Sequence, residues 1–213
     1  MMKKKTTDSR RIGIFGASGS GKTTKALELV KECRRLIVFD ALDDFIGKFT
    51  RIANFDYLKT YLIKNYSKGF RVAYVPPEGS EPFALSELCY FLRDLQRGFK
   101  FNQHQAKVTL FVDELNISYP LGYHNSKPKN GFSFVNLQGR HYGINVVGCS
   151  QRVSLVDLPF RSNLSDLFIF RCADVNDVKV AAQMLGSKFK QDIIELPNYK
   201  YFYKDISGAV VRG

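Results

Sequence analysis

The sequence predicts an α/β fold with a mainly parallel central sheet, and three observations support this prediction. Short, continuous apolar runs alternate with longer amphipathic stretches, which is typical of strands that alternate with helices. A glycine-rich segment joins the first apolar run directly to the first amphipathic stretch. No internal repeat or flexible linker divides the 213 residues. We therefore expect a single domain over residues 11–213, preceded by a basic arm over residues 1–10.

The apolar runs are short and rich in β-branched or aromatic residues, as strands are. They are continuous rather than alternating with polar residues, so we expect strands that are covered on both faces. The runs are Arg11–Ala17, Leu36–Ala41, Arg71–Val75, Val108–Val112, Ile144–Cys149 and Leu167–Arg171. At the end of the chain, Tyr199–Tyr203 and Ala209–Val211 flank Ser207-Gly208 and predict a terminal β-hairpin.

Helical patterns fill the spaces between these runs. They are Lys22–Arg34, Asp56–Lys68, Leu85–Phe99, Phe132–His141 and Val175–Leu185. Strands that alternate with helices imply right-handed crossovers and hence a parallel sheet. One long segment, Asn116–Gly131, has no clear pattern, and a loop of this length in a domain is usually functional or disordered.

The composition narrows the classes of partner. Lys and Arg total 32 against 20 Asp and Glu, a formal net charge of +12. This charge favours a polyanion, nucleic acid first and anionic lipid second, although a generally basic surface is the simpler alternative. No stretch approaches 18 apolar residues, so we expect no transmembrane segment.

The cysteines and histidines are too scattered to predict a zinc site. Cys33, Cys89, Cys149 and Cys172 form no C-x-x-C pair and lie in apolar surroundings. Such thiols are typical of reduced core residues in a reducing compartment.

A phosphate-binding loop follows the first predicted strand. Residues 16–23, GASGSGKT, fit G-x-x-x-x-G-K-[ST] at a strand-to-helix junction. Glycines allow backbone N–H groups to approach phosphates, and the helix N-terminus favours the anion. Lys22 is expected to reach the β- and γ-phosphates of ATP, and the Thr23 hydroxyl to bind Mg²⁺. The expected nucleotide-binding residues are Gly16, Ser18, Gly19, Ser20, Gly21, Lys22, Thr23 and Thr24.

Two acids follow the apolar run Val108–Val112. Asp113 is expected to hold Mg²⁺ and Glu114 to polarise the attacking water, because ligands bind at the carboxyl ends of such strands. An Asp-Glu pair of this kind favours an ATPase with an additional strand between the two motifs. The strands at Leu36–Ala41 and Arg71–Val75 leave room for it. The simpler alternative is a turn or helix cap after a strand.

The strand Ile144–Cys149 is flanked by two further candidates. Gln151 follows it and is a candidate sensor of the γ-phosphate, or else an exposed polar residue that closes the strand. Arg140 precedes it and can act on the nucleotide of a neighbouring subunit or complement a helix C-terminus. Arg152, Arg161 and Arg171 are rivals for the first of these roles, and one sequence does not choose among them.

The combined motifs resemble the FtsK/HerA superfamily of P-loop motors. The resemblance covers about Arg11 to Met184 and rests on GASGSGKT, LFVDE, GRHYGINVVGCSQR and LPFRSNLSDLFIFR. It implies a RecA-like (ASCE) P-loop NTPase with a central sheet flanked by helices, in which Gln151 is the sensor and Arg140 the trans-acting arginine finger. Soluble members without further domains are similar to genome-packaging ATPases of viruses with an internal membrane and double jelly-roll capsids.

This resemblance implies a hexameric ring that uses ATP to pump double-stranded DNA into a capsid. It places the protein in the host cytoplasm or at the packaging vertex of the virion, with capsid or membrane-associated packaging proteins as partners. A filamentous-phage or conjugation-type ATPase that exports single-stranded DNA is the nearest alternative. A P-loop kinase of small molecules is an alternative of another class.

The DNA contacts are expected in the segment Asn116–Gly131. Basic and aromatic side chains there can meet phosphates and stack on bases, although the segment can also be a solvated insertion. The candidates are Tyr123, His124, Lys127 and Lys129. No motif that reads bases is present, so contacts should be with the backbone and largely independent of sequence. The arm Lys3–Lys5 is a further candidate for DNA, the capsid vertex or lipid, or else a solubilising tail.

Overall fold

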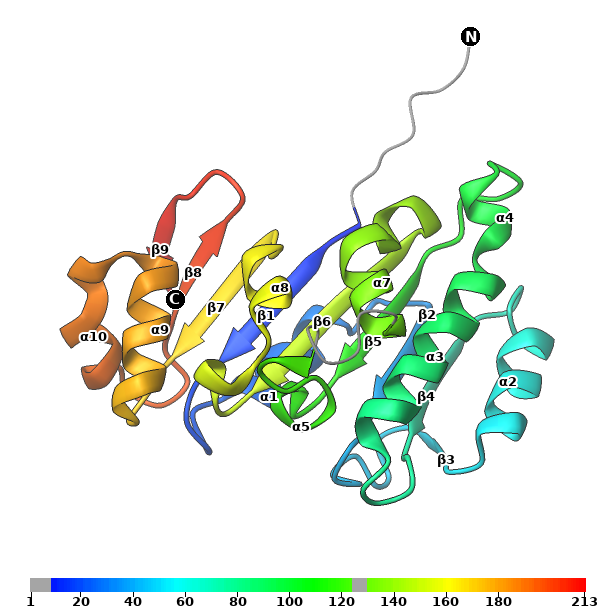
Figure 1. Ribbon diagram of the computed structural model, residues 1–213, viewed down its shortest axis with the longest axis horizontal. Helices are drawn as coiled ribbons and strands as arrows, with labels where there is room; N and C mark the ends of the chain where they lie inside the picture. The colour runs from blue at the N-terminus through cyan, green and yellow to red at the C-terminus, as the bar shows by residue number, and fades with distance from the viewer. Residues whose placement is uncertain (1–8, 124–129) are drawn as a thin grey trace, which may run out of the picture.

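We describe residues 9–123 and 130–213 of a computed structural model. Within these residues nine strands form one sheet in the order β3-β4-β2-β5-β6-β1-β7-β8-β9 (Figure 1). The strands are β1 (Arg11–Phe15), β2 (Arg35–Phe39), β3 (Thr50–Ile52), β4 (Phe70–Tyr74), β5 (Val108–Val112), β6 (Ile144–Ser150), β7 (Asp166–Phe170), β8 (Tyr201–Asp205) and β9 (Val210–Arg212).

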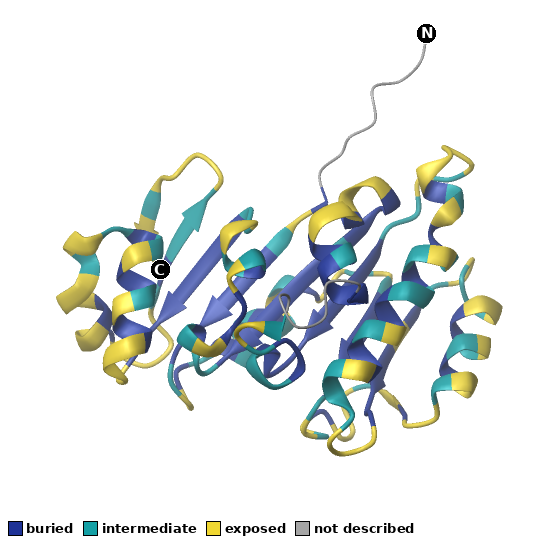
Figure 2. Cartoon of the chain, viewed as in Figure 1, coloured by how far each residue is buried: buried dark blue, intermediate teal, exposed yellow. Residues whose placement is uncertain are grey.

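The strand directions confirm the predicted fold class. Strands β1 to β7 pair in parallel, whereas β8 pairs antiparallel with both β7 and β9, and β8 and β9 form the terminal hairpin. Every residue of β5 and β7 is buried (Figure 2). These two strands are covered on both faces, which is why they read as continuous apolar runs rather than as alternating patterns.

The two faces of the sheet are covered unequally. Successive residues of β5 point to opposite faces: Leu110 packs in the core with the larger set of helices, and Phe111 packs in the core with α1. α1 (Lys22–Leu29) covers the second face (Figure 1). Phe45 packs in the same cluster of buried residues. The helices of the first face are α2 (Phe55–Lys64), α3 (Glu81–Leu95), α5 (Leu115–Ser118), α7 (Gly131–Gln138), α8 (Leu158–Ser162), α9 (Val175–Leu185) and α10 (Lys190–Glu195).

Some helix boundaries differ from the predictions, because a turn or a proline sets where the helix ends or begins. α1 stops at Leu29, because the chain must turn before β2 begins at Arg35. α3 starts at Glu81, since Pro82 is tolerated in a first turn, where its missing N–H has no helical partner. The short α4 (Arg97–Lys100) follows α3, and α9 has the predicted bounds.

Several short elements carry no signal in the sequence. β3 has only three residues, two of them exposed, so it forms no apolar run. The helices α5, α8 and α10 span four to six residues, which is too short for a helical period to emerge. The structure also describes three 3₁₀ turns: η1 (Gly139–Tyr142), η2 (Val153–Leu155) and η3 (Ser187–Phe189).

Both ends of the segment Asn116–Gly131 lie in helices, α5 and α7. It begins within α5, and the next residue, Tyr119, is fully buried, with its hydroxyl 2.7 Å from the Ser133 hydroxyl. At the other end, the Asn130 side chain accepts hydrogen bonds from the first turn of α7. The expectation of an irregular segment is therefore wrong where the segment overlaps α5 and α7.

The strand between the two nucleotide motifs is β6. It pairs with β1, which leads into the phosphate loop, and with β5, which ends at Asp113. The additional strand predicted from the Asp-Glu pair is present, but β2 and β4 do not fill this place. They lie on the far side of β5, toward the edge of the sheet.

Candidate nucleotide site

The phosphate loop lies between β1 and α1 and depends on glycine at two tightly packed positions. Gly16 and Gly21 have φ values of 154° and 110°. A Cβ at Gly16 would lie 2.6 Å from Phe170 Cβ, and one at Gly21 would lie 2.8 Å from Tyr199 Cδ1. The loop is also held from outside, since the Ala17 N–H donates to the Arg171 carbonyl at 2.7 Å. Space and backbone conformation both require glycine there.

Lys22 opens α1 and folds back over the loop. Its side chain is buried, and Nζ donates to the Ala17 carbonyl at 2.9 Å. Burial lowers the pKa of Lys22, and the nearby Glu114 and Asp113 partly offset this effect. Ser20 Oγ is buried and has no hydrogen-bond partner among the residues that the structure describes. The loop thus holds a buried cation and an unpartnered hydroxyl at the start of a helix, a setting that suits an anion.

The two acids lie at the carboxyl end of β5. Both are buried: Asp113 is 8% exposed and Glu114 is 9% exposed. Burial, together with the charge of Glu114, raises the pKa of Asp113 to about 7. Glu114 adopts a left-handed conformation with a φ of 47° at the start of α5. Such a backbone is uncommon for a residue other than glycine, and strained residues of this kind concentrate at functional sites.

The acids and the loop offer oxygen ligands that fit Mg²⁺. Asp113 supplies a carboxylate and Thr23 a hydroxyl, donor types that this cation prefers. A bound cation would also counter the burial that now raises the pKa of Asp113. The chemistry of these donors is therefore consistent with the predicted metal ligands.

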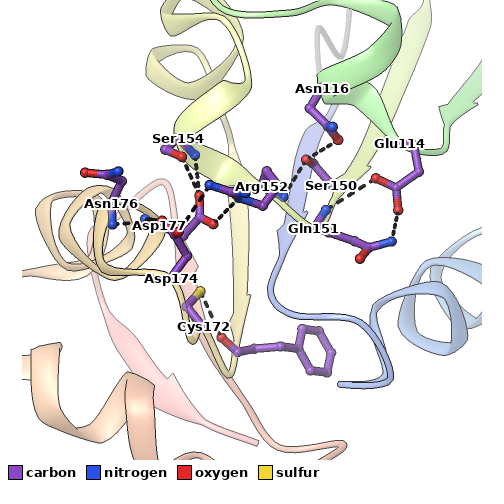
Figure 3. Close-up of polar contacts among 11 residues, drawn as sticks. Glu114, Asn116, Ser150, Gln151, Arg152, Ser154, Cys172, Asp174, Asn176 and Asp177 are labelled. Carbon is purple, nitrogen blue, oxygen red and sulfur yellow. Dashed lines mark hydrogen bonds and ion pairs between the residues drawn. The ribbon is translucent and has the colours of Figure 1, made fainter.

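Gln151 extends from the end of β6 to Glu114 (Figure 3). Its side-chain Nε2 donates to Glu114 Oε1 at 2.7 Å, and its backbone N–H lies 3.5 Å from Oε2. Next to it, the Ser150 hydroxyl donates to Asn116 Oδ1 at 2.7 Å. The structure thus brings Lys22, Asp113, Glu114 and Gln151 into one site, as their places at neighbouring strand ends predict.

Arg140 lies away from this site. It belongs to η1, which precedes β6, whereas Gln151 follows β6, so the seven residues of the strand separate them. Arg140 is exposed and contributes to a pocket of about 600 Å³ at the amino edge of the sheet. Burial lowers the pKa of Arg11, and the positive charge of Arg140 adds to this effect. The other charged residues that line this pocket are Arg10, Asp166 and Asp205.

The three rival arginines are engaged within their own chain. Arg152 Nε donates to Asp177 at 2.7 Å, and its guanidinium lies 3.3 Å from Asp174 (Figure 3). Arg161 Nε donates to the Val156 carbonyl at 2.9 Å, and the Arg171 guanidinium lies 3.3 Å from Asn198 Oδ1. Arg140 instead lies 3.4 Å from the neighbouring His141 ring and has no carboxylate partner among the described residues.

Of the predicted DNA-binding residues, the structure describes Tyr123 alone. Tyr123 is half-buried, and its ring lies edge-on to Tyr119 with the centroids 6.2 Å apart. His124, Lys127 and Lys129 lie outside the described residues, as does the arm Lys3–Lys5.

Tyr199 is a residue of the site that the sequence patterns missed. Its backbone N–H donates to the Ser20 carbonyl of the phosphate loop at 2.8 Å. In the sequence it appears only as the first residue of the predicted hairpin. Its nearness to the loop arises because the connection from α10 to β8 passes beside α1, a contact between residues far apart in the chain.

The sheet order and the phosphate loop together define a P-loop ATPase fold. The chain is similar to the genome packaging NTPase B204 from Sulfolobus turreted icosahedral virus 2 in complex with ATP-gammaS. The TM-score is 0.70 and the sequence identity 14%, over 97% of this chain and 97% of that one. The same NTPase in complex with AMP is similar with a TM-score of 0.69 and 13% identity, over 96% of each chain.

Larger ATPases are also similar. The cytoplasmic domain of the type VII secretion ATPase EccC from Thermomonospora curvata has a TM-score of 0.59 and 17% identity, over 95% of this chain and 25% of that one. ATPases 2 and 3 of EssC from Geobacillus thermodenitrificans have a TM-score of 0.53 and 13% identity, over 97% of this chain and 39% of that one. No family model and no curated protein matches the sequence.

These comparisons confirm the predicted fold class and, at the level of fold, the resemblance to genome-packaging ATPases. Across residues 9–123 and 130–213, no helix is long and apolar enough to cross a bilayer.

Proposed function

We propose that the protein is an ATP-driven translocase of double-stranded DNA that packages a viral genome as a hexameric ring. The observation that carries this proposal is the contact between Gln151 and Glu114 beside the buried Lys22. It joins a candidate general base, a candidate γ-phosphate sensor and a phosphate loop across three adjacent strands. Similarity over nearly the whole chain to a genome packaging NTPase supports the packaging role.

In the proposed mechanism the chain's own residues bind and orient ATP. Backbone amides of the loop and Lys22 neutralise the phosphates. Glu114 accepts a proton from the water that attacks the γ-phosphorus, and ADP leaves with phosphate as the other product. Thr23 and Asp113 would hold Mg²⁺, which would supply charge neutralisation to the phosphates. Gln151 positions Glu114 and responds to the presence of the γ-phosphate.

Arg140 is proposed to complete the site of a neighbouring subunit. An exposed arginine at the amino edge of the sheet lies far from its own phosphate loop but is available to a neighbour. There it would stabilise the charge that develops on the transferred phosphoryl group. The ion pairs of Arg152 with Asp177 and Asp174 make that rival less available for the role.

DNA is proposed to contact the segment Asn116–Gly131, which follows the hydrolysis site directly. Tyr123, His124, Lys127 and Lys129 would meet the DNA backbone, with little dependence on sequence. The net charge of +12 is consistent with such a partner. The ring would act in the host cytoplasm or at the virion packaging vertex, beside capsid or membrane-associated packaging proteins.

The decisive experiment measures ATP hydrolysis with and without DNA while light scattering gives the oligomeric state. We expect stimulation by double-stranded DNA in a hexamer, with DNA affinity that falls steeply as salt rises. Stimulation by single-stranded DNA alone would instead support an export ATPase. Hydrolysis that ignores DNA and requires a phosphate acceptor would support a small-molecule kinase and overturn the proposal.

A further inference from the structure

An exposed aromatic ring borders the phosphate loop. Tyr199 and residues of the loop and of the first turn of α1 line a pocket of about 170 Å³. The Tyr199 backbone N–H donates to the Ser20 carbonyl at 2.8 Å, and Tyr199 also lies against Gly21, where any Cβ would clash with it. Tyr199 is therefore attached to the loop rather than placed near it by chance.

The backbone at Tyr199 is strained. The Lys200 N–H donates to the Pro197 carbonyl at 3.2 Å and closes a turn in which Tyr199 has a φ of 65°. Turn positions with positive φ usually hold glycine or asparagine, which tolerate this conformation. The Tyr199 residue is also 65% exposed, so burial of the ring offsets little of this strain. A strained, exposed tyrosine beside a binding pocket points to a role in function rather than in stabilising the fold.

We propose that Tyr199 is the platform on which the nucleobase stacks when the phosphates occupy the loop. This inference rests on the proposed function, because it requires that the loop bind a nucleoside triphosphate. The phosphates would lie at the loop amides, so the nucleoside must leave the loop along its open side, where Thr24 is exposed and Tyr199 forms the wall. An exposed aromatic ring stacks favourably on another flat ring system, and a purine base provides one.

The proposal separates the base from the phosphates, and this separation gives its test. Tyr199→Asn removes the ring but keeps a residue that tolerates positive φ, so the melting temperature should stay the same or rise. Its affinity for ATP should fall roughly 10- to 100-fold, as when a stacking partner is lost. Its affinity for inorganic tripolyphosphate, which has no base, should not change. Tyr199→Phe keeps the ring, so its affinity for ATP should match that of the wild-type protein.

Two outcomes of these titrations would overturn the inference. One is an equal loss of affinity for ATP and tripolyphosphate, which would mean that Tyr199 shapes the loop and does not contact the base. The other is an unchanged affinity for ATP in Tyr199→Asn. If the wild-type protein itself bound no ATP, the proposed function would fail and this inference with it. If the wild type binds ATP and Tyr199→Asn binds it equally well, only this inference fails.

The chain contains no tryptophan, which permits a direct optical readout. Tyr199→Trp would introduce the chain's one tryptophan at the proposed platform, where it can be excited selectively. Its emission should change saturably with ATP and with GTP, because stacking tolerates any base, and should not respond to tripolyphosphate. Tyr57→Trp is the matched control, since Tyr57 is an exposed tyrosine of α2 outside the site. An equal response of both tryptophans, or a response to tripolyphosphate at Tyr199→Trp, would contradict base stacking.

Discussion

Gln151 donates a hydrogen bond from its side-chain amide to Glu114 at 2.7 Å, and this bond links the carboxyl ends of β6 and β5. Glu114 is buried and has a left-handed backbone, so its carboxylate is held by both its conformation and its partner. A contact of this kind orients a general base and connects it to the strand beside the phosphate loop. The roles of the two residues can be separated by substitution.

Replacing Glu114 with glutamine should stop hydrolysis without preventing ATP from binding. The amide has the same size as the carboxylate but does not accept the proton from water, so turnover should fall by about 10²- to 10⁴-fold. Steady-state ATPase assays and titration with ATP measure the two effects. Glu32→Gln, at an exposed acid after α1, is the control. Unchanged turnover in Glu114→Gln would remove Glu114 from the mechanism.

Gln151→Ala should lower kcat more than it weakens ATP binding. A hydrogen bond to a charged group contributes about 1.5–3 kcal/mol, so kcat should fall about tenfold or more. The same substitution in the Glu114→Gln background should add little, because the residue that Gln151 orients no longer works as a base. Gln138→Ala, at an exposed position of α7, is the control. Full additivity of the two substitutions would show that Gln151 acts independently.

Lys22→Ala should abolish binding of both ATP and tripolyphosphate. The buried ammonium lies beside the loop amides, where it is expected to pair with phosphate oxygens. Calorimetric titration with each ligand measures the loss, and Lys31→Ala, an exposed lysine just after α1, should bind normally. This pattern differs from that of Tyr199, whose loss should affect ATP alone. Normal binding of tripolyphosphate by Lys22→Ala would contradict the phosphate-loop assignment.

Mixing two inactive variants should restore hydrolysis if Arg140 acts on a neighbouring subunit. An Arg140→Ala subunit retains its own Glu114, and a Glu114→Gln subunit retains Arg140, so some mixed interfaces contain both groups. Activity measured across mixing ratios should pass through a maximum. Arg97→Ala, at an exposed arginine of α4, should be active without any partner. Mixed assemblies that stay inactive at every ratio would count against Arg140.

Asp166 should contribute stability that depends on pH. Its burial would raise the pKa, but hydrogen bonds from Arg10, Tyr203 and Ser165 outweigh burial and lower it below the usual value. The stability from a carboxylate with a lowered pKa is present above its unfolded pKa of about 4 and is lost as pH falls through the folded pKa. Asp166→Asn should therefore lower the melting temperature at pH 7 and have a smaller effect near pH 3, where the carboxylate has begun to lose its stabilising role. An equal effect at both pH values would contradict this account.

The order of motifs along the chain was enough to predict most of the fold. Buried parallel strands are continuous apolar runs, and each of the six predicted runs overlaps a strand of the sheet. The phosphate loop, the Asp113-Glu114 pair and Gln151 all follow such runs, so their places at one edge of the sheet follow from parallel pairing alone. Short elements such as β3 and α5 were missed, because three or four residues do not establish a period.

The contacts between distant residues required the tertiary structure. The sheet order puts β6 between β1 and β5, and this arrangement places Gln151 against Glu114 and Arg140 at the opposite edge. The path from α10 to β8 places Tyr199 on the phosphate loop, although the two are far apart in sequence. Local patterns reflect which face of a strand or helix is buried. Which side chains meet depends on how separate elements pack together, and that is a property of the whole core.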